Sequence, residues 1–283
     1  LVVLPVVGLI ELHSNGQGLL SVLEAQGPFF ADVFGGAQGW AAFAIIISGL
    51  SWGFGYLGQP HLLIRFMAIK NPSGIKKSRI IAFLWAIPAF SGAMIIGLIG
   101  LAMYGQGYFA DIEHIMPVLA TRLLPAWLAG IFISGAIAAM MSTADSQLLV
   151  ITSSVIEDFY HKTLGKDLSD KVLLNLSRLI TVAVGLLGFF IAITSEKLIF
   201  SLVSYAWAGL GASFGPSLLL ILKWKHISPK AVIASMLTGT ITTIVWSEIS
   251  FLDDAISVRF SAFALSFAMA VIVSLLDKQK RQS

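Results

Sequence analysis

The sequence predicts an all-α, polytopic membrane protein, and three observations support this fold class. Of the 283 residues, 57% are hydrophobic and only 12% are charged, whereas a soluble domain averages about 25% charged residues. Apolar runs recur along the chain, and several reach about 18 residues, the length that a helix needs to cross a bilayer. Because these runs are continuous rather than alternating, they indicate helices and not the strands of a barrel.

The apolar runs give the expected elements in chain order. The run 1–12 starts without a Met or a basic flank, so we interpret it as one partial span that is truncated at its start. Seven complete spans are expected after it, at residues 39–67, 80–104, 124–156, 172–194, 198–222, 231–246 and 260–276. Polar turns such as 70–74 and 223–230 separate these runs, and they contain glycine, proline and charged residues.

The distribution of basic residues predicts the orientation of the chain. Fifteen of the 18 Lys and Arg residues fall in one set of alternate loops and at the C-terminus, and only Arg122, Lys197 and Arg259 lie in the opposite loops. Cytoplasmic loops are enriched in Lys and Arg. We therefore expect an integral protein of the cytoplasmic membrane, with the loop 70–79 and the C-terminus in the cytoplasm.

The same distribution bears on the partners of the protein. The net charge of +3 is explained by topology, so we expect contact with membrane lipid and no nucleic acid as a partner. Cysteine is absent from the sequence, which excludes disulfides and thiolate metal sites within it.

A polar stripe inside the apolar run 124–156 is the first candidate site. Ala139, Ser142 and Thr143 share one helix face, and Ser146 continues it one turn further on. Asp145 lies beside this face, and a carboxylate inside a bilayer costs about 2.5–3.5 kcal/mol on insertion scales. Hydroxyls and a backbone carbonyl are hard oxygen ligands for a small cation such as sodium. The alternative is that these hydroxyls only bond back to their own helix or join neighbouring helices.

An aromatic and glycine-rich segment within the run 39–67 is the second candidate site. Trp52, Tyr56 and Pro60 are spaced four residues apart and would form one ridge of a helix. The glycines between them and the proline are poor helix formers, so we expect the helix to break here. A broken membrane helix with aromatic walls suits a small, partly apolar solute, and the alternative is an interfacial aromatic belt. The glycine-rich run 209–216 would be a further interrupted segment, either a hinge or a kinked packing helix.

Three motifs give the chain a family resemblance. They are the run 52–61 (WGFGYLGQPH), the runs 141–143 (MST) and 146–150 (SQLLV) taken together, and the run 202–209 (LVSYAWAG). In these motifs, and in order over essentially its whole length, the chain resembles the solute:sodium symporter family, and its sodium/proline symporters most closely.

The resemblance implies a fold for residues 1–283 as a single transmembrane transporter domain. This fold is of the LeuT type, with two inverted five-helix repeats and flanking helices. The truncated span 1–12 would end the first repeat, residues 39–222 would form the second repeat, and residues 231–276 would be accessory helices. The first core helix of the family would precede this chain. Because that helix donates carbonyls to both sodium and substrate in the family, the chain alone is not expected to transport.

The resemblance also carries over a cation site. The family's sodium site corresponds to the backbone carbonyl of Ala139 and the hydroxyls of Ser142 and Thr143. A second sodium site of some relatives corresponds to Ser142, Asp145 and Ser146, where those relatives carry serine in place of Asp145. We therefore treat Asp145 and Ser146 as a second candidate cation site, in which Asp145 is either a ligand or a structural counter-ion.

The function that the resemblance implies is sodium-coupled uptake of L-proline across the cytoplasmic membrane by alternating access. The family's proline-site residues correspond to Trp52, Tyr56 and Pro60. Sodium would be the coupling ion, with no other cofactor and no enzymatic step. The alternatives are a symporter of the same family for another small solute, a transporter-like input module of a sensor protein, and a channel, although no filter is evident in the sequence.

Overall fold

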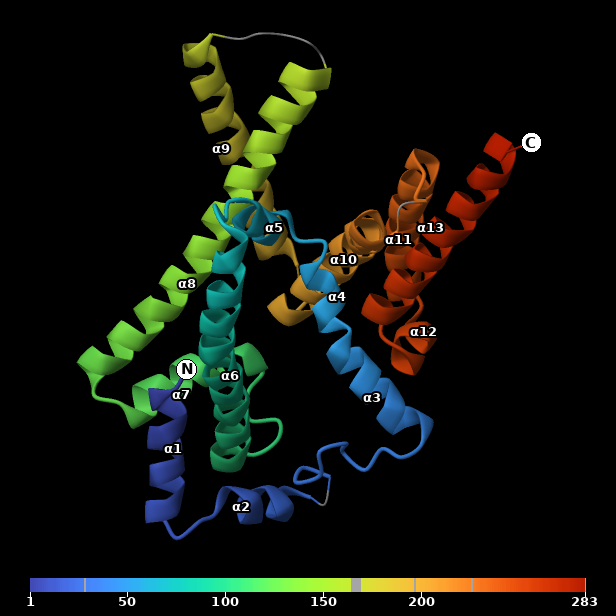
Figure 1. Cartoon of the computed structure of the whole chain (residues 1–283). Helices are drawn as coiled ribbons and strands as arrows, with labels where there is room; N and C mark the ends of the chain where they lie inside the picture. Colours follow the sequence, from blue (N-terminus) through green and yellow to red (C-terminus); the bar gives the residue numbers. More distant parts are fainter. Residues whose placement is uncertain (28, 164–168, 196, 225, 283) are drawn as a thin grey trace. The chain divides into compact units, whose positions relative to one another are not determined.

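The computed structural model describes residues 1–27, 29–163, 169–195, 197–224 and 226–282, and every regular element among them is a helix (Figure 1). The helices pack into two compact units. Unit 1 comprises Leu1–Val22 and Pro72–Lys197, and unit 2 comprises Leu23–Asn71 and Leu198–Ser283. The short helix α2 (Leu19–Gln26) contains the boundary between them. Each unit has its own hydrophobic core.

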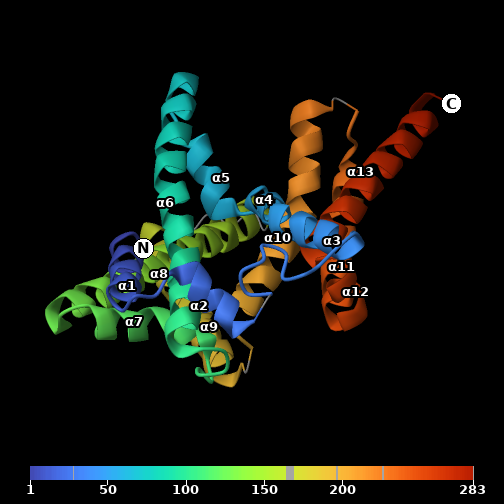
Figure 2. The same cartoon turned by 90° about the horizontal axis from the view of Figure 1, so that it is seen from below.

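Unit 1 begins with a packed group of three helices. The elements of unit 1 as a whole are α1 (Val3–Ser14), α6 (Pro72–Tyr104), η1 (Ile112–His114), α7 (Ile115–Leu123), α8 (Ala126–Ser153), η2 (Ser154–Thr163) and α9 (Asp170–Thr194). Helix α1 lies beside α6 and α7 in both views (Figure 1, Figure 2). Leu4, Ile99 and Leu119 form the centre of this group. Gly8 lets the Ile99 side chain pack closely against α1, because a Cβ at this position would lie only 2.9 Å from that side chain.

The remaining helices of unit 1 expose apolar side chains over long stretches. Helix α9 crosses α8 (Figure 1), and none of its own residues is buried. Leu179 and Phe189 on α9 and Trp85 on α6 are among the exposed side chains. A helix that is apolar on all sides is stable only inside a protein or inside a bilayer. The chain is therefore part of an integral membrane protein.

Unit 2 is held together by small side chains and paired hydroxyls. Its elements are α3 (Trp40–Leu50), α4 (Trp52–Tyr56), α5 (Pro60–Met67), α10 (Ile199–Lys223), α11 (Pro229–Glu248), α12 (Ser250–Ala255) and α13 (Val258–Gln282). The Ser235 and Ser266 hydroxyls lie 2.9 Å apart between α11 and α13, and those of Ser213 and Thr240 lie 2.9 Å apart between α10 and α11. The fully buried Ala212 lets these helices approach closely, as is typical of helix packing in membranes.

Several predicted spans agree closely with helices. The spans 172–194, 198–222 and 231–246 correspond to α9, α10 and α11 within two residues at each end. Among the described residues, six helices are long and apolar enough to cross a membrane. The number rises to seven if the bent pair Trp40–Tyr56 and Pro60–Met67 is one span.

Other predicted boundaries differ, for physical reasons. Helix α6 begins at Pro72 rather than at residue 80, because its charged first turns continue the helix beyond the apolar run. Helices α2, α7 and α12 were not predicted, because they are too short to produce long apolar runs. Of the two alternatives for the run 209–216, the structure favours the packing helix over the hinge, because α10 continues without interruption through Pro216. Gly211 instead serves close packing, since a Cβ there would lie 2.6 Å from the Cα of Gly55.

Candidate functional site

The polar stripe of unit 1 forms one face of α8. The Thr143 hydroxyl donates a hydrogen bond to the Ala139 carbonyl (3.2 Å), and the Ser146 hydroxyl donates one to the Ser142 carbonyl (2.9 Å). Ala139, Ser142 and Thr143 are exposed, and Ser146 is half-buried. The Thr143 bond to the preceding turn uses its hydroxyl hydrogen and leaves the oxygen lone pairs to accept a cation. The face therefore presents a row of oxygens, two of which, from Ala139 and Thr143, are held side by side.

The Asp145 carboxylate is exposed on the same helix, next to this row. In the described part of the chain, no Lys, Arg or His side chain lies within 4.0 Å of its oxygens. No described basic side chain is therefore close enough to Asp145 to support its interpretation as a structural counter-ion. Its assignment as a second cation ligand, together with Ser146, stays a prediction.

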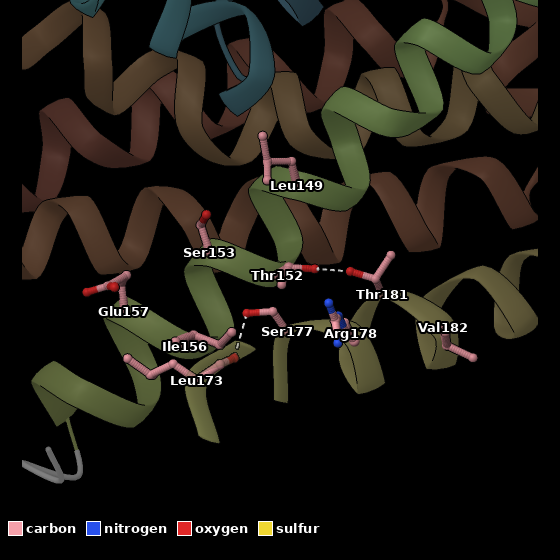
Figure 3. Close-up of a pocket in the computed structure, with 10 residues that line it drawn as sticks. All are labelled: Leu149, Thr152, Ser153, Ile156, Glu157, Leu173, Ser177, Arg178, Thr181 and Val182. Atoms are coloured by element: carbon pink, nitrogen blue, oxygen red, sulfur yellow. Dashed lines mark hydrogen bonds between the residues drawn. The ribbon is translucent and has the colours of Figure 1, made fainter. Parts of the chain in front are cut away.

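A cavity of about 420 Å³ lies farther along α8, where α8 and η2 meet α9 (Figure 3). The hydroxyls of Thr152 on α8 and Thr181 on α9 share a hydrogen bond of 3.1 Å beside it. Glu157 of η2 and Arg178 of α9 add opposite charges to its lining. Sequence reasoning does not find this cavity, because α8, η2 and α9 form it together from residues that are separated along the chain.

The predicted helix break is present in unit 2. Helices α3 and α4 are followed by α5 at a bend of 56°, and Leu57–Gln59 lie between α4 and α5. Gln59 is extended (φ −89°, ψ 106°), because a residue before proline disfavours the helical conformation. Pro60 takes the first position of α5, where no N–H donor is needed. The single ridge predicted for Trp52, Tyr56 and Pro60 is therefore wrong: the first two lie on α4, and Pro60 begins the next helix.

An aromatic cluster joins α4 to α10. The Trp207 ring centroid lies 6.1 Å from that of Trp52 and 4.9 Å from that of Tyr56, the latter edge-on. The Trp207 indole N–H donates to the Trp52 carbonyl (3.0 Å). Gly55 allows this approach, because a Cβ there would overlap the Trp207 ring. Tyr56 is 47% exposed, so the cluster presents an accessible aromatic face.

Sequence reasoning treated Arg259 only as a residue of an outer loop. The structure places its guanidinium over the Trp52 ring, 4.6 Å from the ring centroid. It also donates to the hydroxyls of Ser51 and Ser204 and to the carbonyl of Ser48. No spacing rule could have found a partner that is 208 positions away in the chain.

An apolar cavity of about 370 Å³ lies beside the break within unit 2. Gly58 and Pro60 line it from the break, and Phe214 and Ser217 line it from α10. The Ser217 hydroxyl and the side-chain amide nitrogen of Gln59 are buried without a hydrogen-bond partner among the described residues. An unpaired buried donor costs roughly 1–3 kcal/mol. Of these two donors, only Ser217 belongs to a residue that lines the cavity, and the aromatic residues of α4 do not line it.

Comparison with known proteins gives one family and a set of similar transporters. The model of the sodium:solute symporter family matches residues 2–239. The high-affinity proline transporter of Bacillus subtilis is 37% identical over 286 residues, which cover 100% of this chain and 59% of the relative. The osmoregulated proline transporter of the same organism is 35% identical, over 91% of this chain and 52% of the relative.

A sodium/proline symporter of Escherichia coli is 34% identical, over 98% of this chain and 55% of that protein. The chain thus spans a little over half the length of these relatives. The matches run across both units and include the polar stripe of α8 and the broken helix α4–α5.

Proposed function

The chain belongs to the sodium:solute symporter family, and from this premise we propose that the protein takes up L-proline together with sodium across the cytoplasmic membrane. The family and its relatives are transporters rather than enzymes. The observation that carries the proposal is the similarity to proline transporters along 91–100% of the chain. The coupling ion that the family implies is sodium.

In this proposal, sodium binds to the Ala139 carbonyl and the Ser142 and Thr143 hydroxyls of α8. The exposed row of oxygens and the lone pairs left free by the helix back bonds support this choice. Coupling follows if sodium binds the outward-facing state more tightly than the inward-facing state. The membrane potential then adds about 2.3 kcal/mol per charge per 100 mV.

Proline is proposed to bind at the helix break, against Trp52 and Tyr56 on α4 and beside Pro60. The apolar cavity that Pro60 lines suits a pyrrolidine ring. The side-chain amide of Gln59, the residue before Pro60, is buried without a hydrogen-bond partner among the described residues, although Gln59 does not line that cavity. Asp145 and Ser146 are proposed as a second cation site.

The proposed architecture is the LeuT-type inverted repeat, with residues 1–12 ending the first repeat, 39–222 forming the second, and 231–276 as accessory helices. The break at Leu57–Gln59 supports it, since discontinuous helices are typical of such transporters. The C-terminus is proposed to lie in the cytoplasm, with the basic loops.

The test is uptake of radiolabelled L-proline by the full-length protein in proteoliposomes. We expect accumulation with an inward sodium gradient, and its loss when the gradient is dissipated or sodium is replaced by choline. Competition by an excess of other amino acids and small carboxylates then identifies the solute. Proline uptake that is indifferent to sodium would contradict the coupling. Stronger competition by another solute than by unlabelled proline would favour a symporter of this family for that solute.

A further inference from the structure

We propose that Arg259 is a positioning residue for the substrate half-helix α4: it fixes Trp52, and with it Tyr56, in the arrangement that receives the solute. The contacts that support this role lie entirely within unit 2 and do not depend on the transport assay. Its effect on transport rests on the proposed function.

The first support is the number of elements that one side chain joins. Arg259 lies in the first turn of α13, and its guanidinium covers the Trp52 ring at 4.6 Å from the ring centroid. Its Nε donates to the Ser51 hydroxyl, at the junction of α3 and α4, and one terminal nitrogen donates to the Ser48 carbonyl of α3, both at 3.4 Å. The other terminal nitrogen donates to the Ser204 hydroxyl of α10. The side chain thus ties α3, α4 and α10 to α13.

The second support is the kind of partner that Arg259 has. Among the described residues, no Asp or Glu oxygen lies within 4.0 Å of its guanidinium. The nearby Asp253 uses one carboxylate oxygen to accept the backbone N–H of Val258 (2.7 Å). The planar fork of arginine is therefore directed at neutral oxygens and a ring face, where its geometry matters more than charge pairing.

The third support comes from the other contacts of Trp52. Its backbone carbonyl accepts the Trp207 indole N–H (3.0 Å), and the Phe200 ring lies 5.6 Å from its own ring. Trp52 is thus held by its ring through Arg259 and by its backbone through Trp207. Helix α4 then ends at the break at Leu57–Gln59, where the chain bends by 56° into α5.

A binding wall that is already ordered costs less conformational entropy when the solute arrives. Loss of the Arg259 contacts would let Trp52 sample other orientations before binding, and this would weaken solute binding more than the later steps of the cycle. The effect on transport should therefore appear in KM and not in kcat.

The experiment compares Arg259→Met, Arg259→Lys and the control Arg122→Met in the full-length protein. Arg122 lies over the Tyr104 ring at 5.1 Å within unit 1, so its removal deletes a similar cation–π pair that includes no residue of unit 2. We expect Arg259→Met to raise the KM for proline about tenfold and to change kcat by less than about twofold. Arg259→Lys keeps the charge without the fork, so we expect an intermediate KM. Arg122→Met should leave KM unchanged.

A second measurement reports on α4 independently of transport. Spin labels at Gly53→Cys on α4 and Leu222→Cys on α10 occupy open positions: a Cβ at Gly53 meets nothing within 4 Å, and Leu222 is 69% exposed. We expect Arg259→Met to broaden the measured distance distribution and Arg122→Met to leave it unchanged. An unchanged distribution overturns the positioning role, and so does a KM that Arg259→Met does not raise in a protein that transports proline. If the distribution broadens but the unmodified protein takes up no proline, the positioning role stands and the proposed solute is wrong.

Discussion

At the level of single residues, Thr143 separates the two interpretations of the α8 stripe. If its hydroxyl is a sodium ligand, Thr143→Ala should raise the sodium concentration for half-maximal uptake about tenfold, which corresponds to about 1.4 kcal/mol of lost binding. Thr143→Ser keeps the oxygen and should stay near the original value. The measurement is the initial rate of proline uptake against sodium concentration.

A matched control for Thr143 exists on α7. The Thr121 hydroxyl donates to the Pro117 carbonyl at 3.1 Å, the same four-residue back bond that Thr143 makes, on a helix without a predicted cation site. Thr121→Ala should leave the sodium dependence unaltered. Equal behaviour of the two alanine variants would mean that the Thr143 hydroxyl serves only its own helix.

Asp145 belongs to the second candidate cation site that the family resemblance implies. An exposed carboxylate without a cationic partner in the described part of α8 and its surroundings is free to take part in cation binding. If Asp145 is a cation ligand, Asp145→Asn should lower the affinity of the protein for sodium, because it removes the negative charge that offsets the cost of dehydrating the cation. We expect about a tenfold higher half-saturating sodium concentration. An unaltered sodium dependence of uptake would remove Asp145 from the candidate site.

At the level of elements, the contact between α4 and α10 depends on glycine. A Cβ at Gly55 would overlap the Trp207 ring, and one at Gly58 would overlap the Leu210 carbonyl, whereas nothing lies within 4 Å of a Cβ at Gly53. Overpacking of this kind costs about 1–3 kcal/mol. We therefore expect Gly55→Ala and Gly58→Ala to lower the thermal midpoint of the purified protein and to impair uptake.

Gly53→Ala is the control for these two variants, and Gly53 lies with Gly55 on α4. Alanine favours a helix over glycine by about 1 kcal/mol, so this variant should match or slightly exceed the unmodified protein in thermal stability. Thermal unfolding in detergent measures all three variants. If Gly53→Ala were as harmful as Gly55→Ala, close packing would not be the reason for glycine in this segment.

The sequence predicts the elements better than their contacts. Hydrophobic periodicity is a property of neighbours along one helix, and it located α9, α10 and α11 within two residues at each end. Glycine and proline chemistry located the break before Pro60. The contacts of Arg259 with Ser51 and of Trp207 with Trp52 join residues 208 and 155 positions apart, and no local pattern encodes such pairs. For the same reason the ridge of Trp52, Tyr56 and Pro60 was misplaced: one helical register was extended across a 56° bend.

At the level of the whole molecule, the candidate residues divide between the two compact units. The oxygens proposed for sodium belong to unit 1, and the aromatic residues proposed for proline belong to unit 2. Thermodynamic coupling requires both ligands to favour the same global state. If sodium and proline bind as proposed, each should therefore tighten the binding of the other by the same factor.

The orientation of the whole chain is open to a direct test at the two ends of α6. Its first turns carry Lys76, Lys77 and Arg79, and the loop beyond its C-terminal end carries Asp111 and Glu113. Because basic loops are retained in the cytoplasm, we expect Lys77→Cys to be labelled only from the cytoplasmic side and Gln106→Cys only from the outside.

The sequence contains no cysteine, so each of these variants adds a single thiol to it, and both positions are exposed. The measurement uses a membrane-impermeant maleimide on right-side-out and inside-out vesicles, and a permeant maleimide should label both variants in both preparations. Labelling of both thiols from one side would mean that α6 does not cross the membrane. Labelling on the opposite sides from those expected would invert the topology, and the proposed cytoplasmic position of the C-terminus would then be wrong as well, because the assignment of every loop follows from the same distribution of Lys and Arg.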